Sequence, residues 1–388
     1  MARFLKLAAT AVLFLLIAAG LAVTIIPRFL DRIYYRGPVS AHFDGQRFFN
    51  PDGEDTARVP SGGSRSGFFW RFLTGSDGRP PWPQDVAVTP SVPARRVAGD
   101  RMVATWIGHA SVLVQTQGLN ILTDPIWSEN AGPLGFGPRR VMAPGIRFDD
   151  LPRIDLVLVS HNHYDHLDTS TLKRLWDRDR PLILTSLGND SVIAQAGVSA
   201  KALDWGQRVS VRSGVEVIVT RNHHWGSRWF TDRNRALWSA FTVRLPGGNL
   251  FFAGDTGLGD GKWPRGAASY GPVRLALLPI GAFRFAPGQL GSGSHIGPPD
   301  AVRVFHRMAP GRALPIHWGT FRLSYEARDT PPLMLSAILR CAGYDPSRFA
   351  STRPGVPVDV PSVVQRQPGG SEARIDECLR TRAVRALH

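Results

Sequence analysis

The sequence predicts an α/β fold in which buried strands alternate with surface helices. Two observations favour it: short apolar runs recur along the chain, and several of them end directly at a histidine or an aspartate. Helix signals lie between these runs, as at Thr330-Pro331, where an N-cap and a proline begin a helix that ends before Gly343. The 388 residues are ample for one large core.

The individual elements follow from the same signals. We expect strands over 101–107, 111–116, 154–159, 181–185, 215–220, 238–245, 249–254, 274–279 and 312–316. We expect helices over 169–176, 300–308 and 331–341, and a short one near 371–385 in an otherwise loosely ordered tail.

The N-terminus is predicted to be a membrane anchor, residues 1–26. Arg3 and Lys6 precede an uncharged apolar run, Leu7–Ile26, that is long enough to cross a bilayer as a transmembrane helix. A cleaved signal peptide is the alternative, because the small residues Ala18-Ala19-Gly20 resemble a cleavage site.

The side of the membrane on which the rest of the chain lies is less clear from the charges. Arg3 and Lys6 favour a cytoplasmic N-terminus, whereas Arg28, Arg32 and Arg36 favour the reverse. We expect a single-pass anchor with the catalytic domain outside the cytoplasm.

Composition divides the remaining chain. Residues 27–100 form an extension rich in Pro, Gly and Arg, in which 61–67 is predicted to be a flexible linker and the aromatics of 68–72 to pack on the core. A catalytic domain over 101–350 follows, and 351–388 is a C-terminal tail.

The stretch Ser160–Asp168 carries the strongest chemical signal. It follows the predicted strand 154–159 and holds His161, His163, Asp165 and His166. Neutral imidazole nitrogen and carboxylate oxygen are ligands that zinc, manganese or iron accept. The alternating His161 and His163 would face one ion, and Asp165 and His166 could face a second.

Three further strand ends supply the ligands that a second ion requires. Strand 215–220 leads to His223 and His224, strand 249–254 ends at Asp255, and strand 312–316 ends at His317. Ligands gather at strand ends along one edge of an α/β sheet, and Asp255 is a carboxylate that could bridge two ions. The residues alone leave open whether His223 or His224 is the ligand.

These residues resemble the signature of the metallo-β-lactamase superfamily, HxHxDH followed by a distant His, a bridging Asp and a final His. More narrowly, the sequence is similar to the N-acyl-phosphatidylethanolamine-hydrolysing phospholipase D family in its bacterial form. The segments that carry the likeness are 105–110, 122–126, 161–168, 224–225, 237–239, 251–257 and 316–321. The resemblance implies an αββα sandwich, with two facing sheets and helices outside.

The resemblance also implies roles for individual residues. His224 is chosen over His223 because it precedes Trp225, as the family's ligand precedes its Trp. One ion would be bound by His161, His163 and His224. The other ion would be bound by Asp165, His166 and His317, and Asp255 would bind both ions. Tyr164 and His295 would lie near the substrate phosphate, and His109 would support the site. We expect Asp165, Asp255 and His295 to act in catalysis.

The chemistry expected of such a centre is hydrolysis. Two divalent ions, zinc first and manganese or iron as alternatives, would share a water and convert it into a bridging hydroxide that attacks a phosphodiester. His295 would give a proton to the leaving group. The leading function is a phospholipase D-type phosphodiesterase acting on N-acyl-phosphatidylethanolamine or a related phospholipid. The alternatives are a lactonase or ester hydrolase acting on a soluble metabolite and a non-catalytic binding protein.

The net charge of +15 is compatible with an ordinary solvated basic surface or with an acidic partner. We expect phospholipid substrate and an anionic membrane surface. Nucleic acid is disfavoured, because the arginines are spread along the chain rather than gathered in a stripe. Cys341 and Cys378 could be paired or free, and a homodimer is compatible with the sequence.

Overall fold

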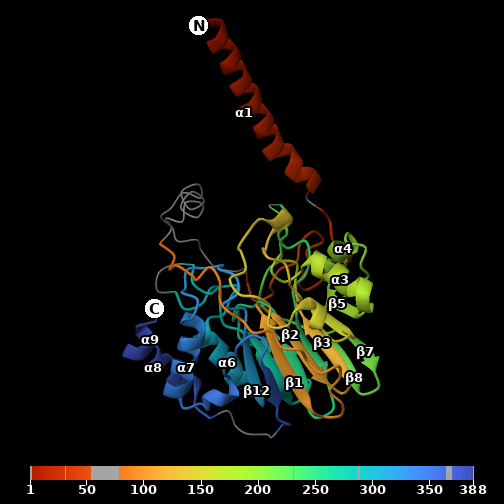
Figure 1. Ribbon diagram of the computed structural model, residues 1–388, viewed down its shortest axis with the longest axis vertical. Coiled ribbons are helices and arrows are strands. Elements are labelled where there is room, and N and C mark those ends of the chain that lie inside the picture. Colours follow the sequence, from red (N-terminus) through yellow and green to blue (C-terminus); the bar gives the residue numbers. More distant parts are fainter. Residues whose placement is uncertain are drawn as a thin grey trace.

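The computed structural model describes residues 2–30, 32–53, 78–229, 231–285, 289–363 and 369–387. Two β-sheets face each other at its centre and helices cover their outer faces, which gives the four αββα layers predicted above. The N-terminal helix α1 (Ala2–Leu30) stands clear of this body (Figure 1).

The first sheet has the order β13-β1-β2-β3-β4-β5-β6. Its strands are β1 (Met102–Gly108), β2 (Ser111–Thr116), β3 (Leu119–Thr123), β4 (Leu156–Val159), β5 (Leu182–Ser186), β6 (Lys201–Leu203) and β13 (Pro357–Val360). The strands from β3 to β6 run parallel, and β1, β2 and β13 are antiparallel to their neighbours. Helices α3 (Thr169–Asp179) and α4 (Asn189–Ala194) belong to its outer layer.

The second sheet has the order β12-β11-β10-β9-β8-β7. Its strands are β7 (Arg208–Arg212), β8 (Val215–Thr220), β9 (Ala240–Arg244), β10 (Asn249–Phe252), β11 (Val273–Pro279) and β12 (Arg312–Ile316). Its outer layer holds α5 (Trp263–Ala268), α6 (Pro298–Met308), α7 (Thr330–Ala342), α8 (Glu372–Cys378) and α9 (Arg382–Arg385). Short 3-10 turns occur at Pro133–Gly135, Phe148–Asp150 and Pro346–Arg348.

The main core lies between the two sheets. Val112 and Val114 of β2 and Val217 and Val219 of β8 are fully buried in one cluster with Phe241. They alternate along each strand because successive side chains point to opposite faces. Burying one such side chain stabilises the fold by roughly 1.5–3 kcal/mol, so this apolar layer holds the strand ends in place.

Helix α7 begins one residue earlier than the sequence predicted. Its N-cap is Asp329 rather than Thr330, and no side chain caps it. A side chain at Asp329 would accept from the N–H groups of the second and third helical residues, but these are Pro331 and the proline after it, which carry no N–H groups. The predicted end is confirmed, because Gly343 adopts the left-handed conformation, with φ 80°, that closes helices.

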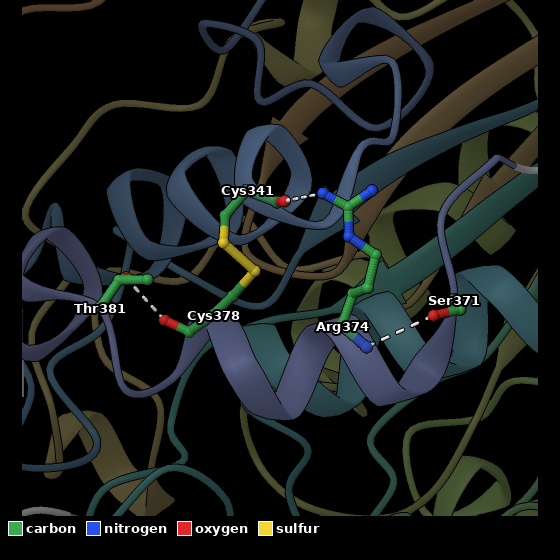
Figure 2. The surroundings of a disulfide bond; sticks show 5 residues. All are labelled: Cys341, Ser371, Arg374, Cys378 and Thr381. Carbon is green, nitrogen blue, oxygen red and sulfur yellow. Dashed lines mark hydrogen bonds between the residues drawn. A yellow bond between two sulfur atoms is a disulfide. The ribbon is translucent and has the colours of Figure 1, made fainter.

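The tail is more ordered than the sequence predicted. Strand β13 pairs with β1, with Met102 opposite Val360, and is too short for a clear alternating pattern. A disulfide between Cys341 and Cys378 ties α8 to α7 (Figure 2). Next to it, the Arg374 guanidinium donates to the Cys341 carbonyl oxygen, 3.1 Å away. The helix predicted near 371–385 is present as α8 and α9.

Much of the N-terminal extension packs on the domain. Phe43 and Phe48 are 1% exposed and form a cluster with Leu237 and Trp238. We call residues 33–53 the strap, since they connect α1 to the body. The linker predicted over 61–67 and the aromatics of 68–72 lie outside the described residues.

Candidate metal centre

The histidine-rich segment runs from the end of β4 to the start of α3. Asp168 is the N-cap of α3, and its carboxylate accepts the N–H groups of Ser170 and Thr171. The same carboxylate accepts the Ser128 hydroxyl at 2.7 Å. The segment between Val159 and Asp168 is thus fixed at both ends, which limits the positions that its imidazoles can take.

A first group consists of three imidazoles. His161 Nε2 lies 2.8 Å from His163 Nδ1, and His224 Nε2 lies 3.4 Å from the same nitrogen. One nitrogen from each ring lies within 4.8 Å of the other two, so the three could coordinate one metal ion. The sequence predicted these three residues together, and the structure brings them together.

A second group lies beside it. His166 Nε2 is 3.4 Å and His317 Nε2 is 3.5 Å from Asp165 Oδ2. His109 Nε2 lies 2.9 Å from the same oxygen, which makes His109 a partner of Asp165 within this group. These are the residues that the resemblance assigned to the other ion, with His109 in the supporting position expected.

Asp255 lies between the two groups. Its Oδ2 is 3.0 Å from both His166 Nε2 and His317 Nε2, and 4.0 Å from His224 Nε2. Asp255 comes shortly after the end of β10. The residue before it, Gly254, has a φ of 60°, which suits the tight turn after the strand. This is the position required of a carboxylate that bridges two ions.

The structure separates the two adjacent histidines. His224 is fully buried and its Nδ1 lies 2.9 Å from the Ser294 carbonyl oxygen, which leaves Nε2 for the first group. His223 turns away, and its Nδ1 lies 3.0 Å from the carboxylate of Asp52 in the strap. A second strap residue, Asn50, donates to the His224 carbonyl oxygen at 2.8 Å.

Charges within the centre balance each other. Burial alone would raise the pKa of Asp255, but the charges of His166 and His317 hold it well below its usual range. Burial alone would lower the pKa of His317, yet Asp255 raises it to about 9, and His166 is raised in the same way. Buried carboxylates are therefore offset by imidazolium charges, a role that a bound cation would take over.

Several buried polar atoms support a cation here. Among the described residues, those without a hydrogen-bond partner include His163 Nε2, Asp255 Oδ1, His295 Nδ1 and His317 Nδ1. Leaving so many buried donors and acceptors unsatisfied is costly. An imidazole and carboxylate donor set suits divalent zinc, manganese or iron, so the residues fit such an ion.

Asp124 was missed as a functional residue by the sequence analysis. Its Oδ2 lies 2.6 Å from His166 Nδ1, which directs Nε2 of that ring toward Asp255. Its other oxygen accepts the Ser160 N–H at 2.7 Å. The available signal was its position, since Asp124 directly follows a strand as Asp255 does.

The two residues expected near substrate occupy different places. His295 Nδ1 lies 3.7 Å from Asp255 Oδ2, and burial lowers the pKa of His295 to about 4. Tyr164 lines a pocket of about 340 Å³ beside the histidine-rich segment. The Arg228 guanidinium lies 3.9 Å from its ring centroid and donates to the carbonyl oxygens of Asn162 and Leu167.

Two facing sheets with a histidine–aspartate cluster at their strand ends define a metallo-β-lactamase-fold protein. The family model described as "Beta-lactamase superfamily domain" matches residues 119–318, so the chain belongs to this family. Of solved structures, the metallo hydrolase Igni18 from Ignicoccus hospitalis is similar over 67% of this chain and 99% of its own, with a TM-score of 0.52 and 20% identity. CmlA, a diiron β-hydroxylase from Streptomyces venezuelae, shares the fold at a TM-score of 0.50, 17% identity, and coverage of 68% of this chain and 54% of its own.

Curated relatives are more similar in sequence. A Caenorhabditis elegans protein named N-acyl-phosphatidylethanolamine-hydrolyzing phospholipase D 1 is 35% identical over 57% of this chain and 64% of its own length. A mitochondrial protein of the same enzyme name from Saccharomyces cerevisiae is 32% identical over 62% of this chain and 52% of its own length. The chain therefore spans less than two thirds of these relatives.

Proposed function

We propose that this chain is a membrane-anchored phosphodiesterase of the phospholipase D type that depends on two metal ions. Its substrate would be N-acyl-phosphatidylethanolamine or a related phospholipid. The observation that carries the proposal is the position of Asp255 Oδ2, within 4.0 Å of imidazole nitrogens from His166, His224 and His317. The names of the two curated relatives support the substrate class.

The first ion would be held by His161, His163 and His224, the second by Asp165, His166 and His317, and Asp255 would contact both. Zinc is the proposed metal, with manganese or iron as alternatives. When bound, such ions supply Lewis acidity, which neutralises charge on phosphate oxygens and lowers the pKa of a water.

His295 is proposed to act on the leaving oxygen. Its ring lies beside Asp255 and is neutral at neutral pH, because burial lowers its pKa to about 4. The neutral ring has one N–H group and can donate a hydrogen bond. Transfer of a full proton requires an anionic substrate that raises this pKa on binding. Tyr164, held by Arg228, is proposed to contact the substrate phosphate from the neighbouring pocket.

Helix α1 is proposed to be the membrane anchor. Its segment Arg3–Ala22 has a mean hydropathy of 2.3, is long enough to span a bilayer and is not buried by the domain. A signal sequence meets the same criteria. The Cys341–Cys378 disulfide supports a domain outside the cytoplasm, since disulfides persist in oxidising compartments.

The test is a substrate panel. Detergent-solubilised full-length protein, with its metal content measured on the same sample, is incubated with phospholipids and separately with lactones and carboxylic esters. Release of phosphatidate from N-acyl-phosphatidylethanolamine is the expected result. If protein with full metal content hydrolysed only lactones or esters, the proposed phosphodiesterase function would be wrong and the alternative, a lactonase or ester hydrolase, would take its place. Inactivity on every compound with both ions bound would indicate a binding protein.

A further inference from the structure

A second pocket lies where the chain leaves α1. It has a volume of about 620 Å³, and its lining includes Ile33, Tyr35, Arg36, Gln46 and Arg235. Ile33 is 52% exposed, so an apolar side chain lies at the surface next to two guanidinium groups. A phenol and an amide complete a lining that combines positive charge, hydrogen-bond donors and apolar surface. We call it the strap pocket.

The charge around the strap pocket is predominantly positive. Arg47 adjoins it, and the Arg47 side chain donates to the backbone carbonyl oxygens of Arg233 and Thr231. The carboxylate beside the pocket, Asp44, accepts the N–H groups of Gln46 and Arg47 and so closes a turn of the strap. Arg36 and Arg235 line the pocket, and the Arg235 guanidinium donates to the Gln46 carbonyl oxygen at 3.2 Å. With Arg47 next to Gln46 in the strap, arginines outnumber carboxylates in this region, which favours an anionic ligand.

The strap pocket is held close to the end of α1. The helix ends at Leu30, and Tyr34 is already buried, with its hydroxyl donating to Asp232 Oδ2 at 2.7 Å. Four residue steps span at most roughly 14 Å, so the pocket cannot move far from the helix end. If α1 crosses a bilayer, the strap pocket lies on the stretch of chain that leaves the membrane, and its distance from the phosphate headgroups is limited by the residues between Ala22 and Tyr34.

The same contacts lead on to the metal centre. Asp232 accepts the N–H of Arg228, whose guanidinium lies against the Tyr164 ring. Asp232 and Arg228 therefore link Tyr34 in the strap with Tyr164 in the second pocket. Phe136, 72% exposed, belongs to the 129–139 loop at the rim of that second pocket. The contacts through Asp232 and Arg228 thus connect the strap to the pocket beside the histidine-rich segment.

We propose that the strap pocket binds the anionic phosphate headgroup of a phospholipid in the bilayer that α1 crosses. This contact would keep the metal-centre end of the domain at the membrane surface, where a lipid substrate can enter. The inference rests on the membrane anchoring proposed above and adds a lipid site that is separate from the metal centre. The group recognised is the phosphate of a headgroup with a net negative charge, and the lipid is its source.

The test uses hydrogen exchange of the full-length protein in vesicles of phosphatidylglycerol or of phosphatidylcholine. Peptides covering 33–37 and 231–236 are expected to exchange at least roughly fivefold more slowly in phosphatidylglycerol, since one arginine near an anionic surface contributes about a factor of five. The double variant Arg36→Gln/Arg235→Gln should lose this difference. The matched control, Arg208→Gln/Arg212→Gln on β7, removes the same charge elsewhere and should keep it.

Other outcomes overturn the proposal. Equal exchange in both kinds of vesicle would exclude a headgroup site. Equal protection by glycerol 3-phosphate in phosphatidylcholine vesicles would assign the pocket to a soluble phosphate. If the protein did not float with the vesicles, α1 would not be a membrane anchor, and the headgroup site that depends on it would be wrong. No turnover is measured, so a protein that lacks phospholipase activity can still show the headgroup site, and the two proposals fail separately.

Discussion

The side chain of Asn50 holds the backbone of His224 across 174 positions of sequence. Its amide nitrogen donates to the His224 carbonyl oxygen at 2.8 Å, and its amide oxygen accepts the indole N–H of Trp238 at 3.1 Å. The metal centre therefore includes a strap residue that lies well before the family-matched region, residues 119–318.

Replacing Asn50 with Ala should weaken metal binding without preventing it. Loss of a contact that orients a ligand typically lowers metal affinity 10- to 100-fold, and we expect about tenfold, because the His224 ring keeps its contact with Ser294. Zinc competition with a chromogenic chelator measures the change. The control Gln195→Ala removes an exposed amide at the end of α4, which donates to the Ser191 carbonyl oxygen, and should have wild-type affinity. Equal affinities would show that the strap does not position His224.

Replacing Asp255 with Asn should remove both metal binding and hydrolysis. The amide keeps the shape of the side chain but loses the negative charge that His166 and His317 face at 3.0 Å. Elemental analysis should find fewer than two ions per chain, and turnover should fall to background. Asp177→Asn, on the exposed face of α3, is the matched control. A variant that kept two ions and its turnover would exclude a bridging carboxylate.

How much of the centre could be predicted depends on how local its signals are. His161 to His166 lie in one short segment, and Asp255 and His317 each follow an apolar strand, so a strand-end rule reaches all of them. The strand-end rule does not distinguish His223 from His224 as the ligand. The family resemblance chose His224 because it precedes Trp225, and the contacts of His223 with Asp52 and of His224 with Ser294 separate the two rings in the structure.

The contacts that the sequence did not predict are long-range. Asn50, Tyr34 and the β13 strand join the domain through partners more than 150 positions away, and no periodic pattern marks them. Short strands with mixed burial, such as β6 and β7, likewise lack the apolar run on which strand prediction depends. Most of the longer strands were predictable because they are buried apolar runs, whereas their arrangement in αββα layers was expected from the family resemblance.

Metal binding should release protons. In the metal-free chain, burial alone would lower the pKa of His317, but Asp255 raises it to about 9. The ring is therefore protonated at pH 7 and must lose its proton before Nε2 can bind a cation, so metal affinity falls as the pH drops. Calorimetric zinc titrations in buffers of different ionisation enthalpy measure the release. No dependence on the buffer would contradict this charge balance.

The same raised pKa predicts a pH effect on the metal-free fold. Because His317 has a higher pKa in the folded than in the unfolded chain, its contribution to stability is fully present below about pH 6.5 and is lost as the pH rises through about 9. The metal-free protein should therefore lose stability in this window, as followed by urea unfolding. The metal-loaded protein, in which the ring binds a cation instead, should not.

Breaking the Cys341–Cys378 disulfide should loosen the C-terminal helices. The bond joins residues 37 positions apart, and the chain-entropy model gives about 4 kcal/mol for a loop of this length. The variant Cys341→Ser/Cys378→Ser should show faster hydrogen exchange in α8 and α9, while the metal content stays unchanged. Alkylating the free thiols of protein taken directly from cells, before any reductant is added, shows whether the two cysteines are paired in their native compartment. Two free thiols there would argue against a domain outside the cytoplasm.

Replacing His295 distinguishes a proton donor from a metal ligand. Its Nδ1 lies 3.7 Å from Asp255 Oδ2, and together with His224 these residues form a group close enough to hold an ion. If His295 acts on the leaving oxygen, His295→Gln should lower turnover by roughly 10²- to 10⁴-fold and keep two ions per chain. If His295 is a ligand, the metal content should fall together with turnover.

The control for this variant is His42→Gln, whose histidine pairs with Asp204 outside the centre and should leave both quantities unchanged. Substrates with leaving groups of different acidity sharpen the test. A more acidic leaving group needs less protonation, so the loss caused by His295→Gln should shrink with such substrates. A loss that is the same for all leaving groups, with both ions present, would mean that His295 positions the substrate and transfers no proton.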